Sequence, residues 1–178
     1  MRSIVFGVLL AVVVLVGHPV NATVPATQVP CDFVTGGGFI VGTGNAPPPP
    51  ATETLAEGAK GTFGVGGGVR NGAFWGHLEY TDHSTSPPLN VHGTGVIGYS
   101  GTANTRVIQG TAEVNGTDGF TYTVTVTDNG EPGRGADQFS ITVDELGYTA
   151  GGILAGGNIQ LHKANASTTP PHGFTCQP

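Results

Sequence analysis

Phe120-Thr-Tyr-Thr-Val-Thr-Val-Thr127 is the stretch that decides the fold class. Every second residue is aromatic or a valine, and each residue between them is a threonine. Because successive side chains of a β-strand point to opposite faces of the sheet, this period of two predicts a strand with one buried face and one hydroxyl-bearing face. Aromatic and β-branched residues are also enriched in strands.

The same alternation recurs on both sides of this stretch. Segments 138–143 and 74–80 alternate apolar and polar residues, and Trp75, His77 and Glu79 share one face of the second segment. Both segments are therefore predicted to be strands with one buried face. Further strands are expected at 36–42, 60–66, 89–99, 105–114 and 157–163.

Turn residues mark the joints between these strands, because asparagine, aspartate and glycine tolerate a positive φ and proline presets a turn. Residues 44–51 contain four consecutive prolines, which predict an exposed polyproline loop. A short helical turn is expected only within 52–58. The joints are Asn71-Gly72, Asn115-Gly116, Asp118-Gly119, Asn129-Gly130 and Pro132-Gly133.

These segments together predict an all-β fold, a single antiparallel β-sandwich or barrel of about eight strands. The β domain is expected over 34–163, with a lead-in at 23–33 and a tail at 164–178. The chain has 178 residues, which suits one domain, and 31 of them are glycine. Glycine is thus well above its usual share of about 7%.

Residues 1–22 have the pattern of a cleaved signal peptide. Arg2 supplies a positive start, and an apolar run follows over 4–16. Val20-Asn21-Ala22 fits the small-residue rule for cleavage after Ala22. An uncleaved anchor is the alternative, but the run is short of the ~20 residues that a spanning helix needs. We therefore expect a secreted or cell-surface protein without a membrane span in its mature form.

The two cysteines, Cys31 and Cys176, lie near opposite ends of the mature chain. In an oxidising compartment an even pair predicts a disulfide, which would tie the tail to the lead-in. Two unrelated thiols are the alternative. Without Arg2, 5 basic residues stand against 12 acidic ones, a net charge of −7. This balance argues against nucleic acid or an anionic membrane as the partner.

Several motifs follow one another in a fixed order along the chain. They are Val34-Thr-Gly-Gly-Gly-Phe-Ile40, Gly76-His-Leu-Glu-Tyr-Thr-Asp-His83, Leu89-Asn-Val-His92, Gly119 to Val126, Asp128-Asn-Gly-Glu-Pro-Gly133 and Gly156-Gly-Asn-Ile-Gln-Leu-His-Lys163. In this order they resemble the post-COAP domain family. The resemblance covers about 34–163, and it implies an extracellular β module, found at the carboxyl ends of secreted and surface proteins that are mostly bacterial. The family has no established activity or catalytic residues, so the resemblance implies an accessory role rather than a reaction.

The densest polar cluster of the sequence comprises His77, Glu79, Asp82, His83 and His92. Imidazole and carboxylate groups are suitable zinc or manganese ligands when three or four converge. His77, Glu79, Asp82 and His92 are therefore a candidate transition-metal site. The alternatives are a solvated strand face that ends in a turn, with Asp82 bonded to nearby backbone, and general acid–base chemistry.

A second cluster, Asp128, Asn129 and Glu131, lies at a glycine turn, with Asp137 beyond it. Oxygen ligands around such a turn are candidates for calcium, which prefers six to eight oxygens. A plain hairpin turn at Asn129-Gly130 is the alternative explanation of the same residues.

Aromatic residues offer a third candidate, because Trp75, Tyr80 and Tyr99 could form a carbohydrate-stacking platform or could be buried in the core. Asn115 and Asn165 begin glycosylation sequons.

The leading hypothesis is a secreted, non-catalytic β-domain protein that binds an extracellular protein or glycan or interacts with the cell surface. It needs no cofactor unless calcium binds at the Asp128 turn, and no catalytic residue is assigned. Two alternatives stay open. One is a small secreted metal-dependent enzyme that uses His77, Glu79 and His92, and the other is a structural or assembly module.

Overall fold

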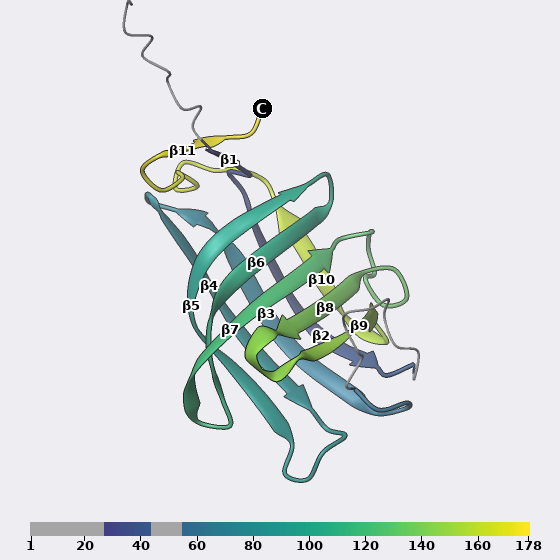
Figure 1. Ribbon diagram of the computed structural model, residues 1–178. Helices are drawn as coiled ribbons and strands as arrows, with labels where there is room; N and C mark the ends of the chain where they lie inside the picture. Colours follow the sequence, from purple (N-terminus) through teal and green to yellow (C-terminus); the bar gives the residue numbers. More distant parts are fainter. Residues whose placement is uncertain (1–26, 44–54) are drawn as a thin grey trace, which may run out of the picture.

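The computed structural model describes residues 27–43 and 55–178, and these form an antiparallel sheet of nine strands that curls into a half-barrel (Figure 1). The all-β fold predicted from the sequence is confirmed. A second, two-stranded sheet of β1 and β11 lies beyond one end of the curled sheet. The strands are β1 Thr27–Val29, β2 Phe33–Val41, β3 Lys60–Arg70, β4 Ala73–Asp82, β5 Leu89–Thr102, β6 Thr105–Val114, β7 Thr117–Thr127, β8 Gln138–Val143, β9 Tyr148–Ile153, β10 Gly156–His162 and β11 Phe174–Cys176, with a 3-10 turn at Asp144–Leu146.

The order of strands in the large sheet is β10-β2-β3-β4-β5-β6-β7-β8-β9. Strands β2 to β9 are therefore a meander, and β10 returns to pair with β2 at the opposite margin. Only Leu154 and Ala155 separate β9 from β10 in the sequence, although these strands form the two margins of the sheet. Leu154 N–H donates to the carbonyl of Asp137, and Ala155 N–H donates to the carbonyl of Phe39. The margins are thus brought together by the curl.

Alternating side chains fill the inside of the curl. The rings of Phe63 on β3 and Phe139 on β8 stack with centroids 3.9 Å apart, although five strand positions separate them in the sheet. The hydroxyls of Tyr80 on β4 and Tyr148 on β9 meet at 2.7 Å. Among the described residues, the largest fully buried side chains are Tyr80, Tyr122, Phe139, Ile40, Leu55, Leu78, Ile108, Ile141, Leu154, Ile159, Val34 and Val65.

Glycines make room for these large side chains. A Cβ at Gly67 would lie 2.6 Å from the Cδ1 atom of Ile108, and a Cβ at Gly61 would lie 2.7 Å from the hydroxyl of Tyr80. Small residues opposite large ones are a common way to fill a narrow barrel interior. The glycine excess of the composition is therefore explained in part by packing.

The structure differs from the sequence prediction mainly at strand ends and at the chain ends. β9 was not predicted, and the lead-in and tail contribute the short strands β1 and β11. Asp118-Gly119 was predicted to join two strands, but it lies inside β7. It stands beside the register shift between β6 and β7 at Ala112 and Val114. Gly119 has φ +102°, which a β-bulge can use. The helical turn expected within 52–58 is absent from its described residues, where Glu57 instead forms a β-bridge with Gly42.

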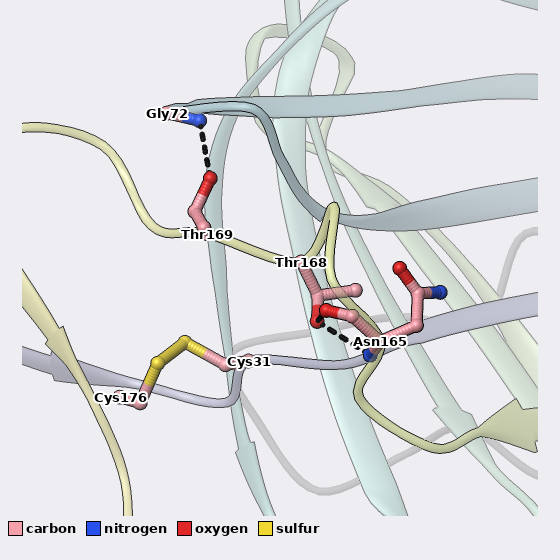
Figure 2. The surroundings of a disulfide bond; sticks show 6 residues. All are labelled: Cys31, Gly72, Asn165, Thr168, Thr169 and Cys176. Atoms are coloured by element: carbon pink, nitrogen blue, oxygen red, sulfur yellow. Dashed lines mark hydrogen bonds between the residues drawn. A yellow bond between two sulfur atoms is a disulfide. The ribbon is translucent and has the colours of Figure 1, made fainter.

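The predicted disulfide between Cys31 and Cys176 is present, and it joins residues 145 positions apart. It fastens the parallel pair β1 and β11, in which Val29 lies opposite Cys176. Figure 2 shows the tail beside this bond, where Thr169 accepts a hydrogen bond from the N–H of Gly72 at 3.0 Å. The tail is therefore ordered by contacts to the β3–β4 turn and not only by its cysteine.

Two expectations lie outside the described residues, namely the signal peptide at 1–22 and the polyproline loop at 44–51. Within the described part of the chain, no helix has the length and apolar character needed to cross a membrane.

Candidate binding site

The outer face of β7, β8 and β9 carries a pocket of about 270 Å³, which we call the hydroxyl pocket. Its outward-facing side chains come from alternate positions of neighbouring strands, so Thr125 on β7 stands beside Ser140 on β8 and Gly151 on β9. Its full lining is Thr43, Thr125, Thr127, Gln138, Phe139, Ser140, Thr149, Ala150, Gly151 and Gly152.

The hollow arises because the outward-facing positions of β9 change from threonine at 149 to glycine at 151. Thr149 continues the outward polar row of Thr123 and Thr142, but the next outward position on β9 is Gly151. A Cβ at Gly151 would lie 2.8 Å from the Cβ of Ser140, so a side chain there would crowd the pocket. The hollow therefore depends on a glycine at this position.

The hydroxyl pocket is uncharged. Its lining offers hydroxyl, amide and backbone groups, and none of its side chains is acidic or basic. Thr127 shares a hydrogen bond of 3.0 Å with Thr105, whereas Thr125, Gln138 and Ser140 make no side-chain hydrogen bond within the described part of the chain. These three side chains are thus available to a ligand. Each hydroxyl and the amide can both donate and accept.

The candidate transition-metal cluster is divided between the two faces of the sheet. Glu79 and His92 are cross-strand partners on the outer face, and His92 Nδ1 lies 2.5 Å from Glu79 Oε1. Asp82 belongs to the inner face with Leu78 and is only 1% exposed. The prediction that Asp82 shares a site with His77, Glu79 and His92 is therefore wrong, because Asp82 follows the inward alternation of β4.

The remaining histidines of that cluster have other neighbours. The ring of His77 leans over Gly66 of β3, where a Cβ would lie 2.9 Å from its Cε1 atom. The His83 ring shares a hydrogen bond with the hydroxyl of Thr62. In the described residues, no group of three or more His, Cys, Asp or Glu side chains is arranged to hold a metal ion. Glu113, which the sequence analysis did not single out, is the other cross-strand neighbour of His92.

Asp82 has a structural role inside the half-barrel. Its Oδ2 accepts a hydrogen bond from the Tyr148 hydroxyl at 3.0 Å, and its Oδ1 accepts one from Ser84 N–H. Burial raises the pKa of Tyr148, and the charges and hydrogen bonds of Tyr80 and Asp82 raise it further. A protonated Tyr148 is therefore the form that this network holds.

The candidate calcium residues lie in the loop 128–137, which we call the margin loop. β10 pairs with β2 on one side only, and the margin loop covers its other side. Asp137 Oδ2 accepts a hydrogen bond from Ile159 N–H, and Asp128 Oδ2 accepts one from Leu161 N–H, both at 2.8 Å. The two carboxylates thus replace a neighbouring strand along the open edge of β10.

The other oxygens of the margin loop are also engaged. Asp137 Oδ1 accepts from Asn129 N–H, and Asp128 Oδ1 accepts from Gly130 N–H. Glu131 Oε1 accepts from the Asn158 side-chain amide at 2.9 Å. The structure therefore explains Asp128, Asn129 and Glu131 through hydrogen bonds to the chain itself. The sequence could not indicate that Asp128 and Glu131 have partners on β10, or that the side chain of Asn104 donates to Asn129 Oδ1 at 2.9 Å.

For Trp75, Tyr80 and Tyr99 the sequence left two alternatives, a stacking platform or burial in the core. The structure buries both tyrosines and leaves only Trp75 on the outer face. Tyr80 and Tyr99 point inward and are 1% and 2% exposed. Trp75 instead contacts Phe33, whose ring centroid lies 5.9 Å away, and Phe33 stacks on His162 at 4.4 Å. The Trp75 Nε1 atom is buried without a hydrogen-bond partner in the described part of the chain. Phe33 of this row covers the bare outer position at Gly68 of β3.

A charged network closes the end of the half-barrel next to the disulfide. The guanidinium of Arg106 donates two hydrogen bonds to Asp32, and the Tyr99 hydroxyl donates a third at 2.8 Å. Burial lowers the pKa of Arg106, but the hydrogen bonds and charge of Asp32 outweigh this and raise it. Burial raises the pKa of Tyr99, and Asp32 adds to the rise. These groups hold the lead-in against β5 and β6.

The hydroxyl pocket was not predicted from the sequence, although Thr125 and Thr127 of its lining belong to the stretch 120–127 that indicated the fold class. Their alternation indicated only an outward face. The one sequence signal of a hollow is Gly151-Gly152 in a segment that was not recognised as a strand. Comparison with family models, curated proteins and solved structures gave no match to this chain.

Proposed function

We propose that this protein is a secreted, non-catalytic β domain that binds an extracellular partner through the hydroxyl pocket. The observation that carries the proposal is the uncharged pocket of about 270 Å³, in which the side chains of Thr125, Gln138 and Ser140 make no hydrogen bond to the described part of the chain. A concave site with a few convergent polar groups is the usual form of a binding site. Its lack of acidic and basic side chains suits recognition better than acid–base chemistry.

The carboxylates of the domain support a non-catalytic role, because many of them are held by hydrogen bonds that stabilise the fold. Catalytic acids and bases need a free atom directed at substrate. The carboxylates with such structural partners are Asp32, Asp82, Asp128, Glu131, Asp137 and Glu145.

Secretion is supported by the Cys31–Cys176 bond, because disulfides persist mainly in oxidising compartments. The leader pattern at 1–22 and the resemblance to an extracellular module point the same way.

The proposal is tested by placing a charge in the pocket. Ser140→Arg would put a long cation among uncharged groups, and Gln160→Arg, at an exposed position of β10 opposite Thr35, is the matched control. Binding of labelled protein to envelopes and secreted material of the producing cells is measured for both variants. We expect Ser140→Arg to abolish binding and Gln160→Arg to retain it. Equal binding by the two folded variants would contradict the proposal.

The Glu79–His92 pair is the one observation that favours the alternative of a metal-dependent enzyme. Elemental analysis of purified protein tests this alternative. Stoichiometric zinc or manganese that disappears in a His77→Ala, Glu79→Ala variant would support an enzyme. Size-exclusion chromatography tests the third candidate, an assembly module, which would elute as a stable oligomer.

A further inference from the structure

We infer that the ligand of the hydroxyl pocket is a neutral polysaccharide. This inference rests on the proposed function and names the chemical class of its ligand. Four properties of the pocket support it, namely its hydrogen-bonding groups, its size, its charge and its surroundings.

The hydrogen-bonding groups of the pocket match those of a sugar. A sugar hydroxyl both donates and accepts, so it is best met by groups with the same dual capacity. Thr125 and Ser140 offer hydroxyls, and Gln138 offers a carboxamide beside them. Thr125 and Ser140 are cross-strand neighbours, and Gln138 stands two residues before Ser140 on the same strand. The three groups therefore lie on one face within a few ångströms of each other.

The rest of the pocket surface is largely apolar. The methyl groups of Thr125 and Thr127 and the bare backbone of Gly151 and Gly152 provide it, while Phe139 and Ala150 belong to the buried inner face. A sugar ring presents C–H groups on its faces and hydroxyls at its edge. The pocket thus pairs both kinds of surface, whereas a peptide would leave the threonine hydroxyls facing its apolar side chains.

The size of the pocket limits the part of the ligand that enters it. Its volume of about 270 Å³ is just below the ~300–1,000 Å³ of typical small-molecule sites. One sugar unit fits such a volume.

The charge of the protein selects a neutral ligand. The full chain carries a net charge of −6, and the pocket itself offers no cation. A polyanionic glycan would be repelled at long range and would find no lysine or arginine in the pocket to pair with. A neutral sugar chain meets neither obstacle.

The surroundings of the pocket favour a polymer over a single sugar. The outward row Gln109, Thr123, Thr142 and Thr149 crosses four neighbouring strands directly beside the pocket. Next to it, Thr111 stands opposite Thr121 and shares a hydrogen bond with Thr94. A chain of sugar units that leaves the pocket would therefore continue over further hydroxyl groups.

The experiment uses affinity electrophoresis of the oxidised full chain in gels that contain a neutral β-glucan, a neutral mannan or polygalacturonate. We expect retardation by at least one neutral polymer and none by the polyanion. The double variant Thr125→Val, Ser140→Ala keeps the shape of the pocket but removes two hydroxyls, and we expect its Kd to rise at least tenfold. Thr102→Val, on the exposed end of β5, is the control and should bind like the wild type.

Periodate and protease treatment of the envelopes used for the proposed function separates the two claims. Binding that is lost after periodate, survives protease and requires Ser140 supports a polysaccharide. Binding that requires Ser140 but is lost after protease overturns this inference and leaves the proposed function standing. Binding that is indifferent to Ser140→Arg overturns both, and so does a failure to bind either the envelopes or any neutral polymer.

Discussion

The two halves of the curled sheet are built in different ways. The glycine half, β2 and β3, has three glycines in nine residues and five in eleven. The threonine half, β7 and β8, has a single glycine, Gly119, in its two strands. Both halves are antiparallel and both bury one face, yet only in the threonine half do side chains of its own strands cover both faces without a run of bare glycine positions.

In the glycine half the surface is borrowed from neighbouring strands. Ile108 of β6 occupies the inner space at Gly67, and on the outer face His77 lies over Gly66 while Phe33 lies over Gly68. Strands without side chains contribute little packing of their own and lose more conformational entropy on folding. We therefore expect the stability of the glycine half to depend on distant parts of the chain, namely the margin loop along β10 and the disulfide.

Reduction of the disulfide should have the largest effect, and it should weaken the glycine half more than the threonine half. Cys31 immediately precedes the glycine half, and the bond closes a loop of about 145 residues, worth ~4–5 kcal/mol in the chain-entropy treatment. We expect a lower melting temperature with retained β-sheet circular dichroism. Hydrogen exchange should quicken in β1, β2, β10 and β11 and stay slow in β7 and β8. Uniform quickening of all strands would show that the halves are equally dependent on the bond.

Gly157→Ala, which changes β10 where it pairs with the glycine half, should destabilise the protein by about 4 kcal/mol. Gly157 has φ +103°, and a Cβ there would lie 2.1 Å from the carbonyl oxygen of Gly37. Backbone strain of ~1–3 kcal/mol adds to the cost of pushing β10 away from β2. The matched control is Gly152→Ala on β9, where a Cβ meets nothing within 4 Å, and its effect should stay within about 0.5 kcal/mol. Urea denaturation measures both, and equal losses would contradict the comparison.

Asp137→Ala should destabilise the protein by about 3 kcal/mol, because it leaves the N–H groups of Ile159 and Asn129 without their acceptor. The matched control in the threonine half is Thr142→Ala, for which we expect less than about 1 kcal/mol. Both are measured by urea denaturation with calcium and with EDTA. A loss that appears only with calcium would revive the calcium site at Asp128, Asn129 and Glu131.

Tyr122→Phe should stabilise the threonine half by about 1 kcal/mol, because the Tyr122 hydroxyl is buried without a partner in the described residues. Burial raises the pKa of Tyr122 to about 12, so the folded state favours the neutral form. Wild-type stability should therefore fall as the pH rises from about 10 through 12, and the advantage of the variant should widen there. Tyr148→Phe, which loses bonds to Tyr80 and Asp82, should instead destabilise. A destabilised Tyr122→Phe protein would point to a hidden partner.

The same contrast explains how far the sequence predicts the fold. Strand β6 was predicted at its observed bounds and β8 likewise, because each of their faces is marked by its own side chains. In β3 the prediction stopped at residue 66, since Gly66, Gly67 and Gly68 give no alternation to follow. β9 was missed for the same reason, as its sequence ends in Gly151-Gly152-Ile153.

The candidate sites show a second limit of prediction from the sequence, which concerns the residues that come together in space. Asp82 and Glu79 are three residues apart, but they lie on opposite faces of β4, so closeness in sequence was misleading. The partners of Asp128 and Asp137 are backbone groups of β10, about 20 to 35 residues further on, and backbone groups leave no mark in a sequence. The hydroxyl pocket likewise depends on the pairing of β7 with β8 and of β8 with β9. This pairing determines which residues lie beside Thr125, and the sequence alone does not show it.

The disulfide that fastens the parallel pair β1 and β11 gives the protein an unusual response to mechanical force. A pull applied between Thr27 and Pro178 passes from Cys31 to Cys176 through a covalent bond, so no strand of the large sheet bears the load. The disulfide prevents the force from extending the segment of about 145 residues that it encloses, which would reach roughly 500 Å when fully stretched. An oxidised domain tethered at both ends would therefore act as a short inextensible link, and a reduced one as a long, yielding tether.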